Sequence, residues 1–515
     1  MTLIGTTRDV AAETRASRKQ RPAKAPKAAK VKAPPAPQGT VLPTGVKPRR
    51  KYLDRVGWYE ISARGISTST RQAEALRLGI AARAGSERAL VLGVDLETGE
   101  IVFSDPISDY AMKDGPRSPT RLINGDVGYG KSTFVKTSGC LRPLMLGRRV
   151  AVVDKKPQGG AGAAEGEYAP IARRLGQEPL RFALDGTGLK INVLDPRIAA
   201  RTGANRAAGQ TDLLRAILVE ALGRPLGELE GKAMRVAHRA ALEAAAERGR
   251  IADIRSLIEP LMNPVSTAGV NAGELRRWGL ECAFALERMI EEDLEGLIDG
   301  PTDERVELGH ALTVFDVSAL PETGPSTSIA MAIINTWLTN ELRNQRAIVP
   351  THFAIEEGWH LVQGSFANVA QRNSKLARGL AMVPEYAIHH FSDIPVESPA
   401  MAMCREAGTV LMFKQANRAD ADAAAGAYNL PAGTAEQLMS LDVGTALLWQ
   451  SGRRPRYIQV VRSDLERDLA DTDGAMLSTA TMRDLIDLED DASFGGDSGG
   501  DGFLPTLEEA MEMHA

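Results

Sequence analysis

The chain has 515 residues, 43% of them hydrophobic, which is enough for two or three globular domains with ordinary cores. Lys and Arg (62) nearly balance Asp and Glu (66), giving a formal net charge of −4. No window approaches the roughly 20 uncharged apolar residues of a membrane span, and the N-terminus lacks a signal peptide's apolar core. We therefore expect a cytoplasmic protein. The three cysteines form no CxxC pair, so they indicate neither a disulfide framework nor a zinc site, and we expect small core residues at Cys140, Cys282 and Cys404.

Charge is concentrated at the two ends of the chain. Residues 15–51 contain twelve Lys/Arg and no Asp/Glu, and the Pro-, Ala- and Lys-rich composition predicts a disordered basic arm over residues 1–51. Residues 484–515 contain ten Asp/Glu and no Lys/Arg, which predicts an acidic, largely disordered tail over residues 481–515. Each end is either a solubilising tail or an interaction arm. The basic arm would contact DNA or anionic lipid, and residues 503–515 would form a short amphipathic docking helix.

The first predicted strands lie in an N-terminal β-element over residues 52–115, where "ALVLGVDLETGEIVFSDP" predicts two strands joined by a Thr-Gly turn. The first part of the core is predicted over residues 116–204. There "TRLING" predicts a strand entering a Gly-rich loop, and "STFVKTSGCLRPLML" predicts the helix that leaves it. "RRVAVVD" predicts a buried strand ending at Asp154, and "PLRFALDG" predicts another. This alternation of strands and helices indicates a mostly parallel α/β sheet.

The Gly-rich loop "GDVGYGKST" has the phosphate-loop spacing G-x-x-x-x-G-K-[ST], with Gly125 and Gly130 as the fixed glycines. Glycines let the loop turn its N–H groups inward on a polyphosphate, and the following helix adds its positive dipole end. Lys131 is predicted to reach the β- and γ-phosphates, Ser132 to bind Mg²⁺, and Thr133 to cover the α-phosphate side. The alternative is a chance match in a Gly-rich turn. The strand–loop–helix order favours the phosphate loop, so the predicted ligands are ATP and Mg²⁺.

Residues 205–300 predict an α-helical subdomain inserted in the core. Apolar residues recur at three- and four-residue spacing, without a convincing strand, in "TDLLRAILVEALG", "GKAMRVAHRAALEAAAER" and "ELRRWGLECAFALERMIEEDL". His238, alone on such a helix, is expected to be a surface or core residue rather than a catalytic one. The second part of the core, over residues 301–480, predicts strands in "HALTVFDVSAL", "THFAIEEGWHL", "YAIHHFSDIP" and "AGTVLMFKQ", and a terminal β-hairpin in "GTALLWQSGRRPRYIQVV".

An acidic pair follows the apolar run in "HFAIEEGWHL". Nucleotide hydrolysis needs a carboxylate for the metal ion and a second group that orients the attacking water. Glu356 is predicted to hold Mg²⁺, through water, and Glu357 to polarise the attacking water. The alternative is an acidic strand end with no chemistry. The apolar lead-in and the upstream phosphate loop favour the functional interpretation.

The order of these motifs closely resembles the C-terminal motor domain of the large conjugative type IV secretion ATPases. The resemblance covers about residues 85–480 and rests on "GDVGYGKST", "VVDKK", "GEYAPIARRLG", "LKINVLDP", "VFDVSAL", "IEEGWHLV" and "HHFSDI". The segments "VLGVDLETGEIVFSDP" and "DTDGAM" are similar to the forms carried on actinobacterial conjugative elements. The resemblance implies a RecA-like P-loop NTPase core with a helical insertion, working as a homo-hexamer whose ATP hydrolysis energises transfer. It also implies recruitment to the inner face of the membrane by membrane-embedded channel proteins.

The resemblance also implies roles for individual residues. It places the nucleotide loop at Gly125, Gly128, Gly130, Lys131, Ser132 and Thr133, and the acidic partner at Glu356 and Glu357. His389 lies where the family usually has a glutamine that senses the γ-phosphate, so the implied catalytic set is Lys131, Glu357 and His389. The chain departs from the family in having Glu-Glu in place of Asp-Glu and His in place of Gln. The compact "DPKGEY" motif of the family is split here into Asp154-Lys155 and the later Gly166-Glu167-Tyr168.

A hexameric motor also needs an arginine donated across the subunit boundary. Five arginines are candidates: Arg372, Arg378, Arg453, Arg454 and Arg456. Two other functions fit the same motifs. One is a double-stranded DNA translocase of the FtsK/HerA type, and the other is a nucleotide-gated structural subunit with little hydrolysis.

Overall fold

The computed structural model describes residues 89–158, 165–184, 186–199, 208–267, 269–309, 311–358, 360, 366–392 and 394–470. The predicted basic arm over residues 1–51, most of the N-terminal β-element and the predicted acidic tail over residues 481–515 lie outside this part of the chain. Within the described part, no helix combines the length and the apolar character needed to cross a bilayer.

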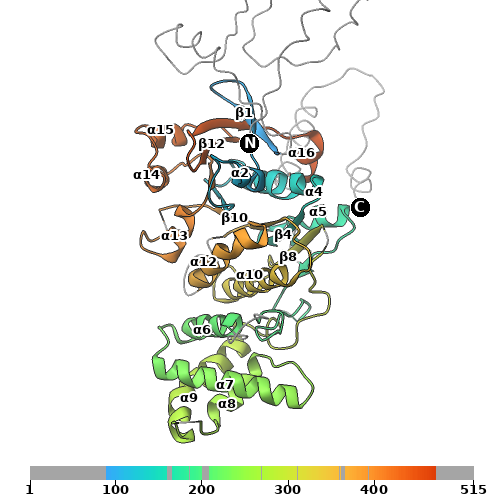
Figure 1. Cartoon of the computed structure of the whole chain (residues 1–515), viewed down its shortest axis with the longest axis vertical. Coiled ribbons are helices and arrows are strands. Elements are labelled where there is room, and N and C mark those ends of the chain that lie inside the picture. Colours follow the sequence, from blue (N-terminus) through green and yellow to red (C-terminus); the bar gives the residue numbers. More distant parts are fainter. Residues whose placement is uncertain are drawn as a thin grey trace, which may run out of the picture. The chain divides into compact units, whose positions relative to one another are not determined.

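A β-sheet forms the core of the described structure (Figure 1). It has eleven strands, in the order β2-β1-β13-β12-β11-β3-β10-β9-β4-β8-β7. Its strands are β1 (Val91–Asp95), β2 (Ile101–Phe103), β3 (Arg121–Asn124), β4 (Arg149–Asp154), β7 (Leu180–Arg181), β8 (Leu312–Asp316), β9 (Thr351–Ile355), β10 (Met382–Ile388), β11 (Thr409–Met412), β12 (Thr445–Gln450) and β13 (Arg456–Val460). From β11 to β7 all neighbours pair in parallel. The strands from β11 to β2 pair antiparallel, which confirms the terminal hairpin and joins β1 and β2 to the same sheet.

The order of the parallel strands confirms the RecA-like core. Strand β10 lies between β3, which enters the Gly-rich loop, and β9, which precedes the acidic pair. Ile388 at the end of β10 pairs with Asn124, and Ile355 at the end of β9 pairs with Tyr386. The carboxyl ends of these strands therefore meet at one edge of the sheet, where ligands bind in open α/β sheets.

Both faces of the sheet are covered, because alternate strand residues enter two separate hydrophobic clusters. Leu122 and Val153 belong to the first cluster, which also contains residues of α10 (Ser326–Asn344), α12 (Ala367–Leu376), α13 (Pro399–Arg405), α14 (Arg418–Ala427) and α15 (Thr434–Met439). Ile123 and Val152 belong to the second, with residues of the helix after the Gly-rich loop and of α5 (Ala169–Arg174). Burial on both faces explains why these strands read as continuous apolar runs rather than alternating ones.

Helices make up most of the described structure between residues 208 and 300. They are α6 (Ala208–Leu222), α7 (Glu228–Glu247), α8 (Ile258–Met262) and α9 (Ala272–Glu292), with a 3-10 turn at Ile254–Leu257. Their apolar side chains continue the first hydrophobic cluster, so the helices share a core with the sheet. His238 on α7 is buried, with 3% of its surface exposed, which confirms a core residue. The three cysteines are likewise free and buried, as expected.

The predicted helix after the Gly-rich loop is confirmed, but its middle is not an α-helix. It begins as α3 (Lys131–Phe134), continues as a π-helix over Val135–Leu141 and ends as α4 (Arg142–Met145). π-Helical turns are rare and are often found at functional sites. A Cβ atom at Gly139 would lie 2.6 Å from Oε2 of Glu385, so the helix rests directly on this β10 carboxylate.

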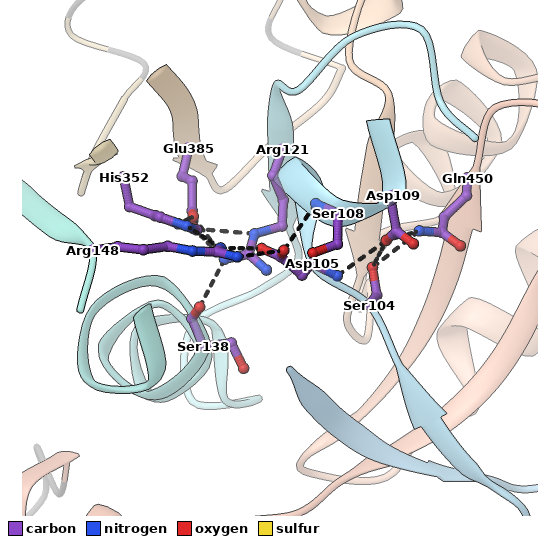
Figure 2. A network of polar contacts seen from close by, with 10 residues as sticks. All are labelled: Ser104, Asp105, Ser108, Asp109, Arg121, Ser138, Arg148, His352, Glu385 and Gln450. Atoms are coloured by element: carbon purple, nitrogen blue, oxygen red, sulfur yellow. Dashed lines mark hydrogen bonds and ion pairs between the residues drawn. The ribbon is translucent and has the colours of Figure 1, made fainter. Parts of the chain in front are cut away.

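Figure 2 shows the buried polar network around Glu385, in the middle of β10, beside the first residue of β3 and the second of β9. Arg121 donates to both carboxylate oxygens of Glu385, with Nη2–O distances of 2.6 and 2.7 Å, and also to the carbonyl of Ser138 at 3.0 Å. Nδ1 of His352 lies 2.7 Å from Oε1 of the same carboxylate. Burial raises the pKa of Glu385, but Arg121 and His352 outweigh it and leave this pKa lowered. The network ties three strands to the helix that leaves the Gly-rich loop.

Candidate nucleotide site

The Gly-rich loop joins β3 to α3 with three glycines in backbone conformations that other residues rarely adopt. The φ angles are +146° at Gly125, +83° at Gly128 and +103° at Gly130. A Cβ atom at Gly125 would also lie 2.7 Å from Cβ of Phe413, so this position needs glycine for space as well. The loop therefore has the backbone that a phosphate loop requires.

Lys131 begins α3 and its side chain turns back over the loop. Its Nζ donates to the carbonyl oxygen of Asp126 at 2.8 Å, and the residue is buried. Burial, and next the nearby charge of Lys156, outweigh the opposite effect of the site's carboxylates and leave the pKa of Lys131 lowered to about 8. The ammonium is thus held inside the loop, where an approaching phosphate would stabilise its charged form.

Glu356 and Glu357 follow β9 directly, at the same sheet edge as the loop. Tyr168 donates its hydroxyl to Oε1 of Glu356 at 2.8 Å. Among the described residues, none donates a hydrogen bond to Oε2 of Glu356, although this atom is buried. Glu357 has a positive φ of 53°, a left-handed conformation that costs a residue other than glycine on the order of 1–3 kcal/mol. Such strain is typical of positions where a side chain must be aimed.

Lys156, two residues beyond the end of β4, connects the loop to the acidic pair. Its Nζ donates to Oγ of Ser132 at 2.7 Å, and lies 3.2 Å from Oε1 of Glu357 and 3.9 Å from Oε2 of Glu356. Burial lowers the pKa of Lys156, but the carboxylates of Glu356, Glu357 and Glu167 outweigh burial and raise it. The ammonium is therefore a permanent positive charge between the two halves of the site.

The oxygen atoms gathered here fit a magnesium ion. The hydroxyl of Ser132 and the carboxylates of Glu356 and Glu357 all approach one ammonium group. Hydroxyl and carboxylate oxygens, with several retained waters, are the ligands that Mg²⁺ prefers. The buried Oε2 of Glu356, which accepts no hydrogen bond from the described residues, suits the metal ion or one of its waters.

The two parts of the split motif, Asp154-Lys155 and Gly166-Glu167-Tyr168, contact each other in the structure, and Tyr168 also contacts Glu356 of the acidic pair. The backbone N–H of Tyr168 donates to Asp154 at 2.7 Å, and that of Gly166 donates to Asp316 at 3.1 Å. A Cβ atom at Gly166 would lie 2.3 Å from Oδ2 of Asp154, so only glycine fits. Burial, reinforced by neighbouring carboxylates, raises the pKa of Asp154 well above its usual value. Glu167 pairs with Lys136 of the π-helix at 3.0 Å.

His389 lies beside Glu357, directly after β10. Its Nε2 is 2.9 Å from Oε1 of Glu357, and because an ionised carboxylate only accepts, Nε2 is the donor. The side chain of Asn124 donates to the carbonyl of His389 at 3.2 Å and fixes its backbone to the end of β3. Of the predicted site residues, the structure thus brings together Lys131, Ser132, Glu356, Glu357 and His389. Thr133 follows them on α3.

Four of the five candidate arginines, namely Arg378, Arg453, Arg454 and Arg456, lie away from this site. The start of β12 lies at the same sheet edge as the loop, because Gly130 approaches Gly444, which precedes β12. The end of β12 lies at the opposite edge, because the backbone N–H of Ser451, which follows β12, donates to the carbonyl of Gly408, which precedes β11. Arg454 and Arg456 are therefore at the opposite edge of the sheet, as is Arg378, which precedes β10. Arg372 forms an ion pair with Asp212, and Arg453 donates to Gln450. Arg378, Arg454 and Arg456 are exposed and make no ion pair with any residue that the structure describes.

Two residues at the site were not assigned a role from the sequence. Lys156 belongs to the quoted "VVDKK" motif and Tyr168 to "GEYAPIARRLG", but neither motif shows what its side chains contact. The sequence could have indicated a role for Lys156 through its position, two residues beyond a buried parallel strand. Side chains at such positions lie at the edge where the other strand ends meet.

No family model and no curated protein sequence matches this chain. Among solved structures, the chain is similar to VirB4 of Thermoanaerobacter pseudethanolicus, with 22% identity and a TM-score of 0.61 over 75% of this chain and 99% of that one. It is less similar to the bacterial conjugative coupling protein TrwBdeltaN70, with 12% identity and a TM-score of 0.46 over 76% of this chain and 91% of that one. The genome packaging NTPase B204 of Sulfolobus turreted icosahedral virus 2 matches at 8% identity and a TM-score of 0.31, over 68% of this chain and all of its own. The similarity to VirB4 supports the RecA-like P-loop NTPase fold described above.

Proposed function

We propose that this protein is a Mg²⁺-dependent ATPase that drives a conjugative or type IV secretion-like transfer apparatus. The observation that carries the proposal is the convergence of the phosphate loop and the Glu356–Glu357 pair at one sheet edge, joined by the Ser132–Lys156–Glu357 contacts. The motif order resembles that of the conjugative ATPases, and the fold is shared with VirB4, one of their members.

The loop residues bind the nucleotide in this proposal. Backbone N–H groups between Gly125 and Gly130 surround the phosphates, Lys131 neutralises the β- and γ-phosphates, and Thr133 covers the α-phosphate side. Ser132 and Glu356 would hold the magnesium ion, which would supply neutralisation of phosphate charge when bound. Tyr168 keeps Glu356 in place through its hydroxyl.

Glu357 orients the attacking water and accepts its proton. His389 donates Nε2–H to Glu357, which holds the carboxylate in one orientation, and it senses the γ-phosphate from the end of β10. Since both residues follow adjacent parallel strands, movement of either strand end on nucleotide binding would be passed to the other.

We further propose that the protein works as a homo-hexamer recruited to the inner face of the cell membrane by channel proteins of the apparatus. A ring places an arginine of one subunit near the nucleotide of its neighbour, where it stabilises the charge on the γ-phosphate in the transition state. The basic residues 15–51 would add contacts to DNA or anionic lipid.

Two substitutions separate binding from hydrolysis. Lys131→Ala should abolish nucleotide binding, because it removes the charge at the phosphates. Glu357→Gln should keep binding and stop hydrolysis, because it removes only the group that activates water. Binding is followed with a fluorescent ADP and turnover by phosphate release. Full turnover by Glu357→Gln would remove this glutamate from the mechanism, and strong stimulation by duplex DNA would indicate a DNA translocase instead.

A further inference from the structure

The ammonium group of Lys156 occupies the position where a metal ion is expected to bind. Nζ contacts Ser132 Oγ at 2.7 Å, Glu357 Oε1 at 3.2 Å and Glu356 Oε2 at 3.9 Å. In the proposed function Glu357 binds the attacking water, and Mg²⁺ takes the oxygen atoms of Ser132 and Glu356. An ammonium and a divalent cation cannot share them, since each draws its stabilisation from the same lone pairs.

We propose that Lys156 is a tethered cation that competes with Mg²⁺ for Ser132 and Glu356 and that partly replaces the metal ion in binding nucleotide phosphates. The inference rests on the proposed function, since it concerns the metal ion of that site.

The surroundings of Lys156 allow its side chain to adopt two positions, one at the carboxylates and one at the phosphate loop. It is partly exposed, with 26% of its side-chain surface accessible, whereas Glu356 is 1% exposed and held by Tyr168. The carboxylate is therefore fixed while the lysine side chain, with four rotatable bonds, can move. When the metal ion takes the oxygens, the ammonium is released beside the phosphate loop, where the γ-phosphate is the next available anion.

The neighbouring lysine provides a matched comparison. Lys155 is buried and points away from the site: its Nζ donates to the carbonyl of Leu320 at 2.9 Å and to Glu322 at 2.7 Å. Removing the charge of Lys155 thus changes the net charge of the protein by the same amount as removing that of Lys156. It leaves Ser132, Glu356 and Glu357 untouched.

The test compares nucleotide binding with and without the metal ion. The dissociation constant of a fluorescent ADP is measured in excess Mg²⁺ and in EDTA, for the wild type, Lys156→Met, Lys156→Arg and Lys155→Met. We expect the ratio of the EDTA value to the Mg²⁺ value to be about tenfold larger in Lys156→Met than in the wild type, equivalent to about 1.4 kcal/mol. The variant gains in metal affinity and loses the substitute cation. Lys156→Arg should lie near the wild type because it keeps the charge, and Lys155→Met should match the wild type.

The ratio separates the two possible failures. A ratio in Lys156→Met within twofold of the wild-type value, or below it, overturns the role of Lys156. If the wild type binds no nucleotide in either condition, the proposed ATPase function fails instead. The folded state of each variant is checked by circular dichroism. A loss of structure in Lys156→Met moves the comparison to Lys156→Gln, to which the same criterion applies.

Discussion

A carboxylate buried in a sheet remains ionised only when its lost hydration is compensated, and for Glu385 the guanidinium of Arg121 supplies the opposite charge while His352 supplies a hydrogen bond. Burial lowers the pKa of His352 itself, so its ring contributes a donor rather than a charge. Neither Arg121 nor Glu385 exposes more than 1% of its side chain. The pair is not part of the nucleotide site, but it supports the helix that begins at Lys131. A residue far from the phosphates thereby helps to position the loop that binds them.

Glu385→Ala should lower the free energy of unfolding by about 3–5 kcal/mol, because it leaves the guanidinium of Arg121 buried without its partner. The measurement is urea unfolding followed by circular dichroism. Asp422→Ala, which breaks the exposed pair between Arg418 and Asp422, is the control and should leave the urea midpoint nearly unchanged. Equal midpoints for the two variants would show that the buried pair contributes no more than a surface one.

Single residues also mark the limit of prediction from sequence. The spacing of Gly125, Gly130 and Lys131 is local, so the phosphate loop can be identified without knowing the sheet. The contact between Lys156 and Glu357 depends on the order β3-β10-β9-β4, and strand order is a tertiary property that the apolar runs do not encode. The strained φ of Glu357 is imposed by its surroundings in the same way.

At the scale of elements, the helices between residues 208 and 300 show how one polar side chain can be buried in an apolar layer. Nε2 of His238 lies 3.2 Å from Oε1 of Gln210, whose amide nitrogen already donates to the carbonyls of Leu194 and Asp195. The amide oxygen must therefore accept, so the neutral imidazole carries its proton on Nε2. Burial lowers the pKa of His238 to about 4.

This shift makes the helical layer sensitive to mild acid. Between pH 6.5 and 4 the unfolded chain binds a proton at His238 that the folded chain does not, so stability falls as pH decreases through this window. At pH 5 the loss should be about 2 kcal/mol relative to pH 7. His238→Gln keeps a donor without a titration and should show a smaller difference between the urea midpoints at the two pH values. Arg239→Gln, an exposed neighbour, should keep the wild-type difference, and the same difference in His238→Gln would exclude this histidine as its source.

The π-helix over Val135–Leu141 is the element that sequence patterns predicted least well. The apolar periodicity of "STFVKTSGCLRPLML" correctly indicates a helix, but its repeat is too close to that of an α-helix to reveal the wider turn. Similarly, "PLRFALDG" predicts a strand, and only Leu180–Arg181 pairs with β8. The partner strand decides how many residues pair, and this information lies elsewhere in the chain.

At the scale of the whole molecule, the proposed ring requires that an arginine reach a neighbouring subunit's nucleotide. Arg378, Arg454 and Arg456 are exposed at the sheet edge opposite the subunit's own phosphate loop. A head-to-tail arrangement, in which one edge of a subunit faces the opposite edge of the next, makes this placement suitable for donation in trans.

Mixed rings would identify the arginine. Each of Arg378→Ala, Arg454→Ala and Arg456→Ala is assayed for phosphate release alone and after mixing with Glu357→Gln subunits. We expect one variant to be inactive alone and to regain activity on mixing, because some interfaces then combine an intact arginine with an intact Glu357. Arg305→Ala, an exposed arginine outside the candidates, should remain active alone. Three active single variants, or an inactive one without recovery, would contradict donation from this edge.

The ends of the eleven-stranded sheet also restrict how the protein can aggregate. In the part of the chain that the structure describes, the outermost strands β2 and β7 have only three and two residues, so each presents few unpaired backbone groups of its own. Long, exposed edge strands promote the aggregation of β-proteins, and very short edge strands are a common protection against it. Short border strands therefore allow many copies of this chain to assemble at high local concentration, as a multisubunit machine requires, while disfavouring edge-to-edge pairing of their sheets.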